Sequence, residues 1–183
     1  EGKYTWSQIN IDVVKLAFIN NIKLIIDEAI NISGKNKKIY LRKNHFIEYD
    51  FLSINIGAES LKENIEGAKK FAYSLKPISE INRVTKLISL SKKNKVVIVG
   101  AGAAGVEVSL ALNKKFEKLS IKKKRILISN NNTILKNYPI SVSKKLEKEI
   151  IKRRITILYN AKVTKVLKSS LIIDNIKKIK DCC

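Results

Sequence analysis

The sequence predicts an α/β protein in which helices cover a parallel sheet. Short runs rich in Val, Ile and Leu alternate with amphipathic segments of helical length, as at residues 95–99, 104–118 and 125–129. The pattern of the first part of the chain returns in the last part, which indicates that one supersecondary unit is used twice. With 183 residues, 45% of them apolar, the chain can bury the core of one domain or of two small ones.

In the first part, Ser7 is a suitable N-cap for a helix over residues 8–20, whose apolar residues fall partly on one face. Further elements are expected as strands near 22–26, 38–42 and 51–55 and a helix over 61–73. Pro77 then marks the passage into a second domain, because proline restricts the backbone of the residue before it.

In the second part, Ser79 begins the cap of a helix that ends near Leu90. The elements after it are a strand over 95–99, a helix over 104–118, a strand over 125–129, a turn around 130–132 and, after Pro139, a helix over 142–153. From residue 154 onward, the strands of a β-meander lead to Asp181-Cys-Cys183, where a further strand begins.

Residues 95–107 hold the most specific motif, Lys95-Val-Val-Ile-Val-Gly100-Ala-Gly102-Ala-Ala-Gly105-Val-Glu107. A strand enters a Gly-x-Gly-x-x-Gly loop and leaves it as a helix. Gly100 permits the tight turn, Gly102 lets the backbone approach a pyrophosphate, and Gly105 lets the helix pack closely on the sheet. The phosphates would bind the unpaired N–H groups at the helix N-terminus. The motif therefore predicts a dinucleotide site; the alternative is a tight turn that binds nothing.

The repeat extends this interpretation to the whole chain. Ile22 and Ile155, like Asp50 and Asp181, are separated by about the same distance in the sequence, and each pair occupies matching places in its copy. Two copies of a helix, strand and β-meander unit predict two related nucleotide-binding domains.

Three stretches resemble a known family: residues 2–12, Tyr49-Asp-Phe-Leu-Ser-Ile-Asn-Ile-Gly57, and Leu75-Lys-Pro-Ile78 running on to the glycine loop. The chain resembles the two-dinucleotide-fold flavoproteins, which include the pyridine nucleotide-disulfide oxidoreductases and type II NADH dehydrogenases, and in particular the branch fused to selenide, water dikinase. In this family an NAD(P)-binding domain is inserted into an FAD-binding domain. The resemblance implies a partial FAD-binding domain over residues 1–75 and a Rossmann-like NAD(P)-binding domain over 76–183, each with a β-meander.

The resemblance also implies a fragment. A family member begins with a first glycine motif that holds the FAD pyrophosphate, and none precedes Glu1. The last strand of the NAD(P) domain only begins at Cys182, so we expect the central part of a larger flavoprotein.

Positions that match the family's motifs predict the cofactor-binding residues of this chain. The nicotinamide dinucleotide would bind Gly100, Gly102, Ala103, Ala104 and Gly105. Glu107 matches a glutamate near the nicotinamide; the alternative is a carboxylate favoured at this place by the helix dipole alone. On the FAD side the matching residues are Ala29, Ile56, Gly57 and Lys76, with Asn55-Ile56-Gly57 replacing the more usual Ala-Thr-Gly.

The resemblance implies an FAD-dependent NAD(P)H oxidoreductase segment in which hydride passes from the nicotinamide to the flavin, with no catalytic side chain assigned. The cofactors are NAD(P)H and, in the complete protein, FAD. The alternative is a non-catalytic or decayed nucleotide-binding fragment without flavin. NADH and NADPH stay open, with a leaning to NADH from the family alone, because the acid expected about twenty residues past the glycines is absent. Ser129 and residues 130–132 occupy that place, and the next acid after Glu117 is Glu147.

The formal net charge of +21 does not predict a nucleic-acid partner, because lysines spread over nearly every segment supply most of it. We expect a cytoplasmic protein whose partners are a nicotinamide dinucleotide and, in the complete protein, a selenide, water dikinase domain. An alternative use of the charge is peripheral association with an anionic membrane surface.

The few cysteines and the single histidine disfavour cysteine redox chemistry and a catalytic triad or metal site. Cys182 and Cys183 are adjacent and begin an apolar strand, which disfavours a redox or metal role, and the second domain has no Cys-x-x-Cys. The single histidine, His45, lies in a loop between meander strands, so neither a triad nor a metal site is expected.

Overall fold

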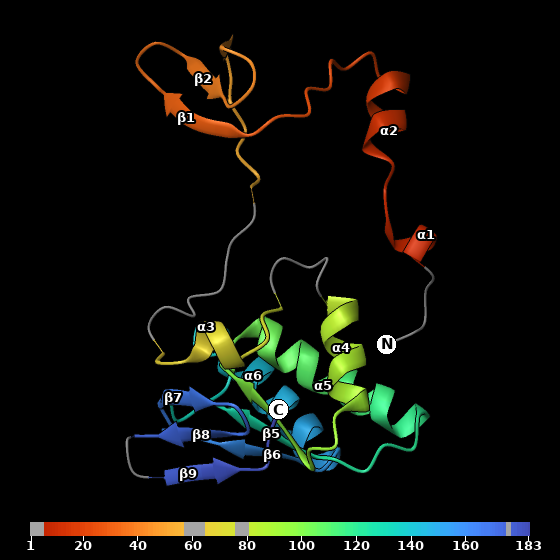
Figure 1. Ribbon diagram of the computed structural model, residues 1–183, viewed down its shortest axis with the longest axis vertical. Helices are drawn as coiled ribbons and strands as arrows, with labels where there is room; N and C mark the ends of the chain where they lie inside the picture. Colours follow the sequence, from red (N-terminus) through yellow and green to blue (C-terminus); the bar gives the residue numbers. More distant parts are fainter. Residues whose placement is uncertain (1–5, 57–64, 76–80, 175–176) are drawn as a thin grey trace. The chain divides into compact units, whose positions relative to one another are not determined.

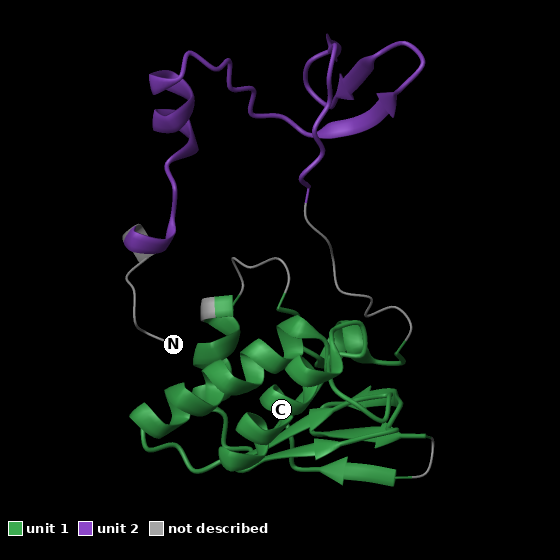
Figure 2. Ribbon diagram, turned by 180° about the vertical axis from the view of Figure 1, so that it is seen from behind, with its two compact units in different colours: residues 1–2, 58–183 green, residues 3–57 purple. Residues whose placement is uncertain are grey.

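The computed structural model describes residues 6–56, 65–75, 81–174 and 177–183. The chain divides into two compact units, one formed by residues 3–57 and the other by residues 58–183 together with the first two residues (Figure 2). Each unit has sheet structure of its own.

The larger unit contains a three-stranded parallel sheet in the order β4-β5-β6, as expected (Figure 1). Its strands and crossover helices are β4 (Lys95–Val99), α5 (Ala103–Lys118), β5 (Lys124–Ile128), α6 (Ile140–Lys152) and β6 (Ile155–Leu158). Cys182 pairs with Lys95 in a parallel bridge on the other side of β4. Where the sequence predicts that a further strand begins, at Asp181-Cys-Cys183, the described residues therefore form an isolated bridge and not a strand. The bridge gives β4 a backbone neighbour on the side opposite to β5.

Both faces of this sheet are covered, which explains why its strands are apolar almost throughout. Val96, Ile98 and Leu127 join a core with Phe116 of α5 and Ile150 of α6. The alternate residues, among them Ile128, Val97 and Ile126, belong to a second core on the meander side. The fully buried side chains of the first core each contribute about 1.5–3 kcal/mol through burial, so they dominate the stability of this unit.

The meander of the larger unit is antiparallel, in the order β7-β8-β9. Its strands are β7 (Val163–Leu167), β8 (Ser170–Ile173) and β9 (Lys177–Lys180). Glu66 bonds to it from outside: its N–H donates to Thr164 O at 3.3 Å, and it accepts the N–H of Val166 at 2.8 Å. An ion pair of 2.6 Å joins Lys165 to Glu66. Residues 65–71, which the predicted domain division assigns to the FAD side, thus pack with the larger unit.

Two helices complete the larger unit, α3 (Ala68–Phe71) and α4 (Ile81–Leu90). Of the helix predicted over 61–73, only Ala68–Phe71 is helical among the described residues, because Gly67 before it adopts a positive φ of 75° that a helix cannot continue through. The predicted cap at Ser79 lies outside the described residues.

The smaller unit contains α1 (Trp6–Ile9), α2 (Val13–Ile19) and an antiparallel sheet in the order β1-β2-β3. The single helix predicted over 8–20 is broken, and the N-cap of its longer part is Asp12, whose carboxylate accepts the Lys15 N–H at 3.0 Å. A new helix begins there because Asp12 satisfies an N–H group that an uncapped start would leave open.

The strands of the smaller unit are β1 (Ala29–Ser33), β2 (Lys38–Leu41) and β3 (Phe46–Glu48). The prediction near 38–42 is confirmed, whereas those at 22–26 and 51–55 are wrong: neither segment forms a ladder in the described part of the chain. An apolar pattern favours extended backbone, but a strand also needs a neighbouring strand in the right register. In this unit β1 and β2 have such neighbours, because the turn between Ser33 and Lys38 fixes the register of their pairing.

The internal repeat is therefore confirmed in the meanders but not in the strand before them. Ile155 lies in β6 because β5 pairs with it, at Arg125. Its counterpart Ile22 has no such parallel neighbour among the described residues.

Candidate functional site

The glycine loop joins the carboxyl end of β4 to α5. Gly100 adopts a φ of 101°, a conformation that favours glycine, and its N–H donates to Ile128 O of β5 at 3.0 Å. Gly102 is the N-cap of α5, and its carbonyl accepts the Val106 N–H at 3.0 Å. The strand, loop and helix expected from the motif are thus in place.

The other two glycines differ in what surrounds them. A Cβ at Gly105 would lie 1.8 Å from Gly100 O, so only glycine lets the first turn of α5 approach the strand exit this closely. A Cβ at Gly102 would meet nothing within 4 Å, so the space in front of this residue is open. The loop is closed by packing at one glycine and left accessible at the other.

The N-terminus of α5 follows this open position. Its first backbone N–H groups have no partner within the helix and carry the positive end of the helix dipole, an arrangement suited to an anion. Ala103 and Ala104 place no bulky or charged side chain there, and the first turn holds no acidic residue. Glu107 lies one turn further along α5 and is exposed.

A hollow of about 270 Å³ extends from the glycine loop to the carboxyl end of β5. The sequence places Ser129 and residues 130–132 at this strand end, and Ser129, Asn130 and Asn131 do line the hollow. The remaining lining residues are Gly100, Ala101, Gly102, Thr133, Leu135, Lys136, Asn137 and Tyr138. The loop and the strand end, nearly thirty residues apart in the sequence, therefore form one surface.

Buried hydroxyl groups hold the segment after β5 in place. Ser129 Oγ donates to Thr133 O at 2.8 Å, and Ser143 Oγ of α6 donates to Ile134 O at 2.7 Å. Beyond them, the Leu135 N–H donates to Ala101 O at 2.8 Å, which ties this segment to the glycine loop. The sequence interpretation missed residues 133–138 and Ser143, because a turn-rich segment carries no signal for this long-range hydrogen bond.

The residues predicted on the FAD side belong to other parts of the chain. Ala29 begins β1, and Ile56 follows the last strand of the smaller unit; both are exposed. Gly57 and Lys76 lie outside the described residues. The structure thus places the residues predicted for the nicotinamide dinucleotide in one loop and the helix after it. Ala29 and Ile56 lie in the smaller unit, which is described by itself.

The cysteines are free thiols on opposite faces of the parallel sheet. Cys182 belongs to the meander-side core, whereas Cys183 packs against the helix-side core. Because alternate residues of a strand point to opposite faces, these neighbours cannot act as a pair. Burial raises the pKa of the Cys182 thiol, which disfavours the reactive thiolate. In the described part of the chain, no cluster of His, Cys, Asp and Glu suits a metal ion.

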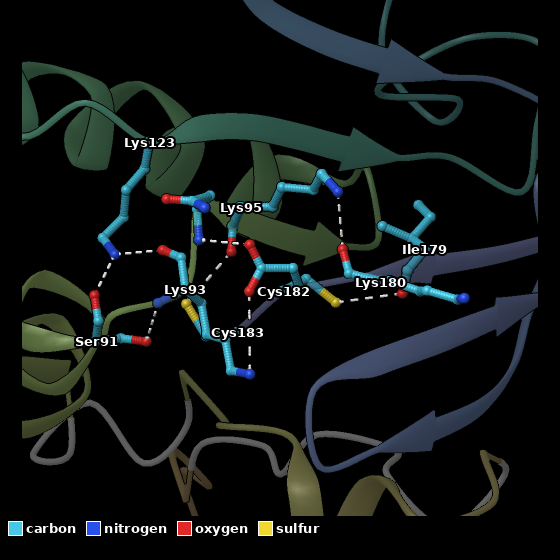
Figure 3. A network of polar contacts seen from close by, with 10 residues as sticks. Ser91, Lys93, Lys95, Lys123, Ile179, Lys180, Cys182 and Cys183 are labelled. Atoms are coloured by element: carbon cyan, nitrogen blue, oxygen red, sulfur yellow. Dashed lines mark hydrogen bonds and ion pairs between the residues drawn. The ribbon is translucent and has the colours of Figure 1, made fainter.

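A network of polar contacts surrounds the cysteines and explains why the terminal residues lie beside β4 (Figure 3). The Lys95 ammonium donates to Lys180 O at 2.8 Å, and the Lys95 N–H donates to Asp181 O at 3.2 Å. Lys123 binds the carbonyls of Ser91 and Lys93, which fixes the entry to β4. These contacts position the strand that leads into the glycine loop.

A family model described as pyridine nucleotide-disulphide oxidoreductase matches residues 7–180. The chain belongs to this family. The resemblance to the pyridine nucleotide-disulfide oxidoreductases is therefore confirmed at the level of the family, and the fold is that of the FAD- and NAD(P)-binding disulfide oxidoreductases.

The chain is similar in sequence to two curated proteins. It is 34% identical over 156 residues to the NADH dehydrogenase-like protein YutJ of Bacillus subtilis, covering 84% of this chain and 43% of that protein. It is 29% identical over 147 residues to an alternative NAD(P)H-ubiquinone oxidoreductase of Arabidopsis thaliana, covering 76% of this chain and 28% of that protein. The chain therefore spans less than half the length of these relatives.

Solved structures show the same fold at lower identity. A ferredoxin reductase from Rhodopseudomonas palustris matches with a TM-score of 0.75 and 17% identity, over 95% of this chain and 43% of that one. NDH2 from Plasmodium falciparum, solved in complex with NADH, matches with a TM-score of 0.67 and 24% identity, over 86% of this chain and 39% of that one.

Proposed function

We propose that the larger unit binds a nicotinamide dinucleotide at the hollow beside the glycine loop. Gly100, Gly102, Ala103, Ala104 and Gly105 would hold the pyrophosphate through backbone N–H groups and the dipole of α5. The observation that carries the proposal is the open space at Gly102, where a Cβ would meet nothing within 4 Å, at the N-terminus of a sixteen-residue helix. A dinucleotide fits this cradle because its phosphates need close backbone approach.

We further propose that the complete protein is an FAD-dependent NAD(P)H oxidoreductase. Bound together, a reduced nicotinamide and a flavin supply the redox chemistry, a hydride carrying two electrons from the first to the second. The chain's own contribution is to hold and orient the nicotinamide dinucleotide, with Glu107 placed one turn beyond the phosphate site. Family membership and the two relatives named for oxidation of NADH or NAD(P)H support this function.

The flavin side of the proposal rests on the resemblance. Ala29, Ile56, Gly57 and Lys76 would contact FAD, and residues 1–75 and 76–183 would belong to the FAD and NAD(P) domains respectively. The packing of residues 65–71 against β7 adds a detail to this division: part of the FAD-side sequence is anchored on the NAD(P)-side meander.

The fused domain, the location in the cell and the electron acceptor of the complete protein are further parts of the proposal. We infer from the resemblance a selenide, water dikinase domain in the complete protein and a cytoplasmic location, with peripheral membrane association as the alternative favoured by the lysine excess. Among the described residues, every helix is too short or too polar to cross a bilayer. Assays of the complete protein with a quinone, a disulfide and a selenium compound as acceptors, with and without lipid vesicles, would distinguish these cases.

The first experiment is a fluorescence titration of the purified chain with NADH and with NADPH, comparing wild type with Gly102→Val. The Cβ of valine at this position would meet nothing within 4 Å in the protein, and the side chain would take up space proposed for the pyrophosphate, so the dissociation constant should rise by about tenfold or more. Gly34→Val is the matched control, because a Cβ at Gly34 also meets nothing within 4 Å and lies in the turn of the other sheet.

Saturable binding that Gly102→Val abolishes and Gly34→Val preserves would establish the site. If the folded wild-type chain bound neither nucleotide, the proposal would fail and the alternative of a decayed fragment would stand. Equal binding by wild type and Gly102→Val would place the nucleotide elsewhere and would also refute the proposed cradle.

A further inference from the structure

The carboxyl end of β5 decides which nicotinamide dinucleotide the site prefers. β5 lies directly beside β4 with Ile128 paired to Val99, and Ile128 O accepts the N–H of Gly100. When the pyrophosphate lies on the helix after the first strand, the adenosine ribose lies at the end of the neighbouring strand. In this chain, that place belongs to Ser129, Asn130 and the segment after them.

The Ser129 hydroxyl is not available to bind the ribose. Ser129 is 2% exposed, and its hydroxyl is committed within the turn, donating to Thr133 O at 2.8 Å and accepting the Asn131 N–H at 3.2 Å. The hydroxyl that stands where a discriminating acid is expected is therefore an internal structural group.

Among the described residues that line the hollow, the charge is positive. None of the described residues that line it carries a carboxylate, whereas Lys136, an exposed lysine, is among them. The next acid in the sequence after the end of β5, Glu147, accepts the hydroxyl of Tyr159 and is thus engaged elsewhere. A phosphate on the ribose would meet a cation and no opposing carboxylate.

Asn130 adds hydrogen-bond donors to this cation. It is exposed, and its Oδ1 accepts the Nδ2 group of Asn131 at 2.8 Å. The NH2 group of Asn130 is consequently the end of the amide that is left to donate to a ligand. Phosphate oxygens accept such donors, and a nearby ammonium strengthens their binding.

We propose that this chain prefers NADPH to NADH, with Lys136 and Asn130 binding the 2′-phosphate. The inference rests on the proposed dinucleotide site and deepens it. The preference arises from a local cation and a free amide, combined with the absence of a carboxylate from the described lining. Lys136 is thereby assigned as the specificity-determining residue.

The test is the ratio of the dissociation constants for NADH and NADPH, measured on the full chain by titration. Wild type should bind NADPH at least about tenfold more tightly. Lys136→Glu should weaken NADPH binding by about tenfold or more and leave NADH binding within about threefold. Asn130→Asp, which places a carboxylate at the strand end, should move the ratio in the same direction.

Lys118→Glu is the matched control, since it makes the same charge change at the far end of α5, about 22 Å along the helix axis from the loop. It should leave the ratio unchanged. The same titrations with 2′,5′-ADP and 5′-ADP should reproduce the ratio, because the difference resides on the ribose.

Wild-type binding of NADH as tight as that of NADPH would overturn the preference while leaving the dinucleotide site intact. A ratio that Lys118→Glu changes as much as Lys136→Glu would show that net charge, and not Lys136, is responsible, and would overturn the assignment. Binding of neither nucleotide would refute the proposed function itself, together with this inference.

Discussion

The contact between Gly105 and Gly100 allows a sharp test of how the loop is built. In Gly105→Ala the new methyl carbon would lie 1.8 Å from Gly100 O and 3.0 Å from Gly100 C, both backbone atoms. Relief to 3.0 Å requires a displacement of about 1.2 Å between the helix and the strand exit. Gly100 cannot yield easily, because its N–H is bonded to Ile128 O.

The cost follows from two opposing effects. Overpacking of this kind destabilises by about 1–3 kcal/mol, and more where backbone must move. Alanine gains up to about 1 kcal/mol over glycine in a helix interior, although less in the first turn. We therefore expect Gly105→Ala to lower the free energy of unfolding by about 1–2 kcal/mol and to weaken nucleotide binding as well.

Urea unfolding of the purified chain, followed by circular dichroism, measures this cost. Gly102→Ala is the control, because its methyl group enters open space at a residue with a negative φ of −75°. Its free energy of unfolding should stay within about 0.5 kcal/mol of wild type. If Gly105→Ala unfolded at the same urea concentration as Gly102→Ala, close packing at Gly105 would not be what the loop requires, and the reasoning would be refuted.

Two further predictions concern side-chain hydrogen bonds. Ser143→Ala, which removes a hydroxyl 3% exposed, should destabilise the chain by about 1 kcal/mol in urea unfolding, whereas the exposed Ser141→Ala in the same helix should have little effect. Burial opposes ionisation of Asp27, but donors including Glu28 N–H and the Asn44 side chain outweigh it and lower the pKa of this carboxyl. A lowered pKa stabilises the folded form above the ordinary pKa of about 4, and the effect is lost as pH falls through the lowered value. The NMR amide signal of Asn44 should therefore shift on acidification in wild type; an identical shift in Asp27→Asn would contradict this account.

Much of the larger unit follows from the sequence because its requirements are local. A positive φ at Gly100 and a close approach at Gly105 exclude other residues, so the motif itself predicts the loop and the helix after it. The apolar strand over 95–99 likewise demands cover on both faces, which predicts a parallel sheet beneath helices.

The smaller unit shows where local patterns fail. Residues 22–26 and 155–158 have similar apolar patterns, yet only the second segment is a strand in the described residues, because β5 lies beside it with matching register. Pairing is a property of two segments, so no single segment can predict it.

The site divides in the same way. The sequence by itself determined the glycine loop, the helix after it, at whose N-terminus we propose that the phosphates bind, and the lack of an acid at the end of the second strand, since each depends on residue type at a given place. Only the tertiary structure decided that the Ser129 hydroxyl is internal, that Leu135 is bonded to Ala101, and that Lys136 reaches the hollow. The Ser129 contact is short in sequence, but the other two join segments more than thirty residues apart, and the packing of α5 and α6 on the sheet, not any local preference, brings those segments together.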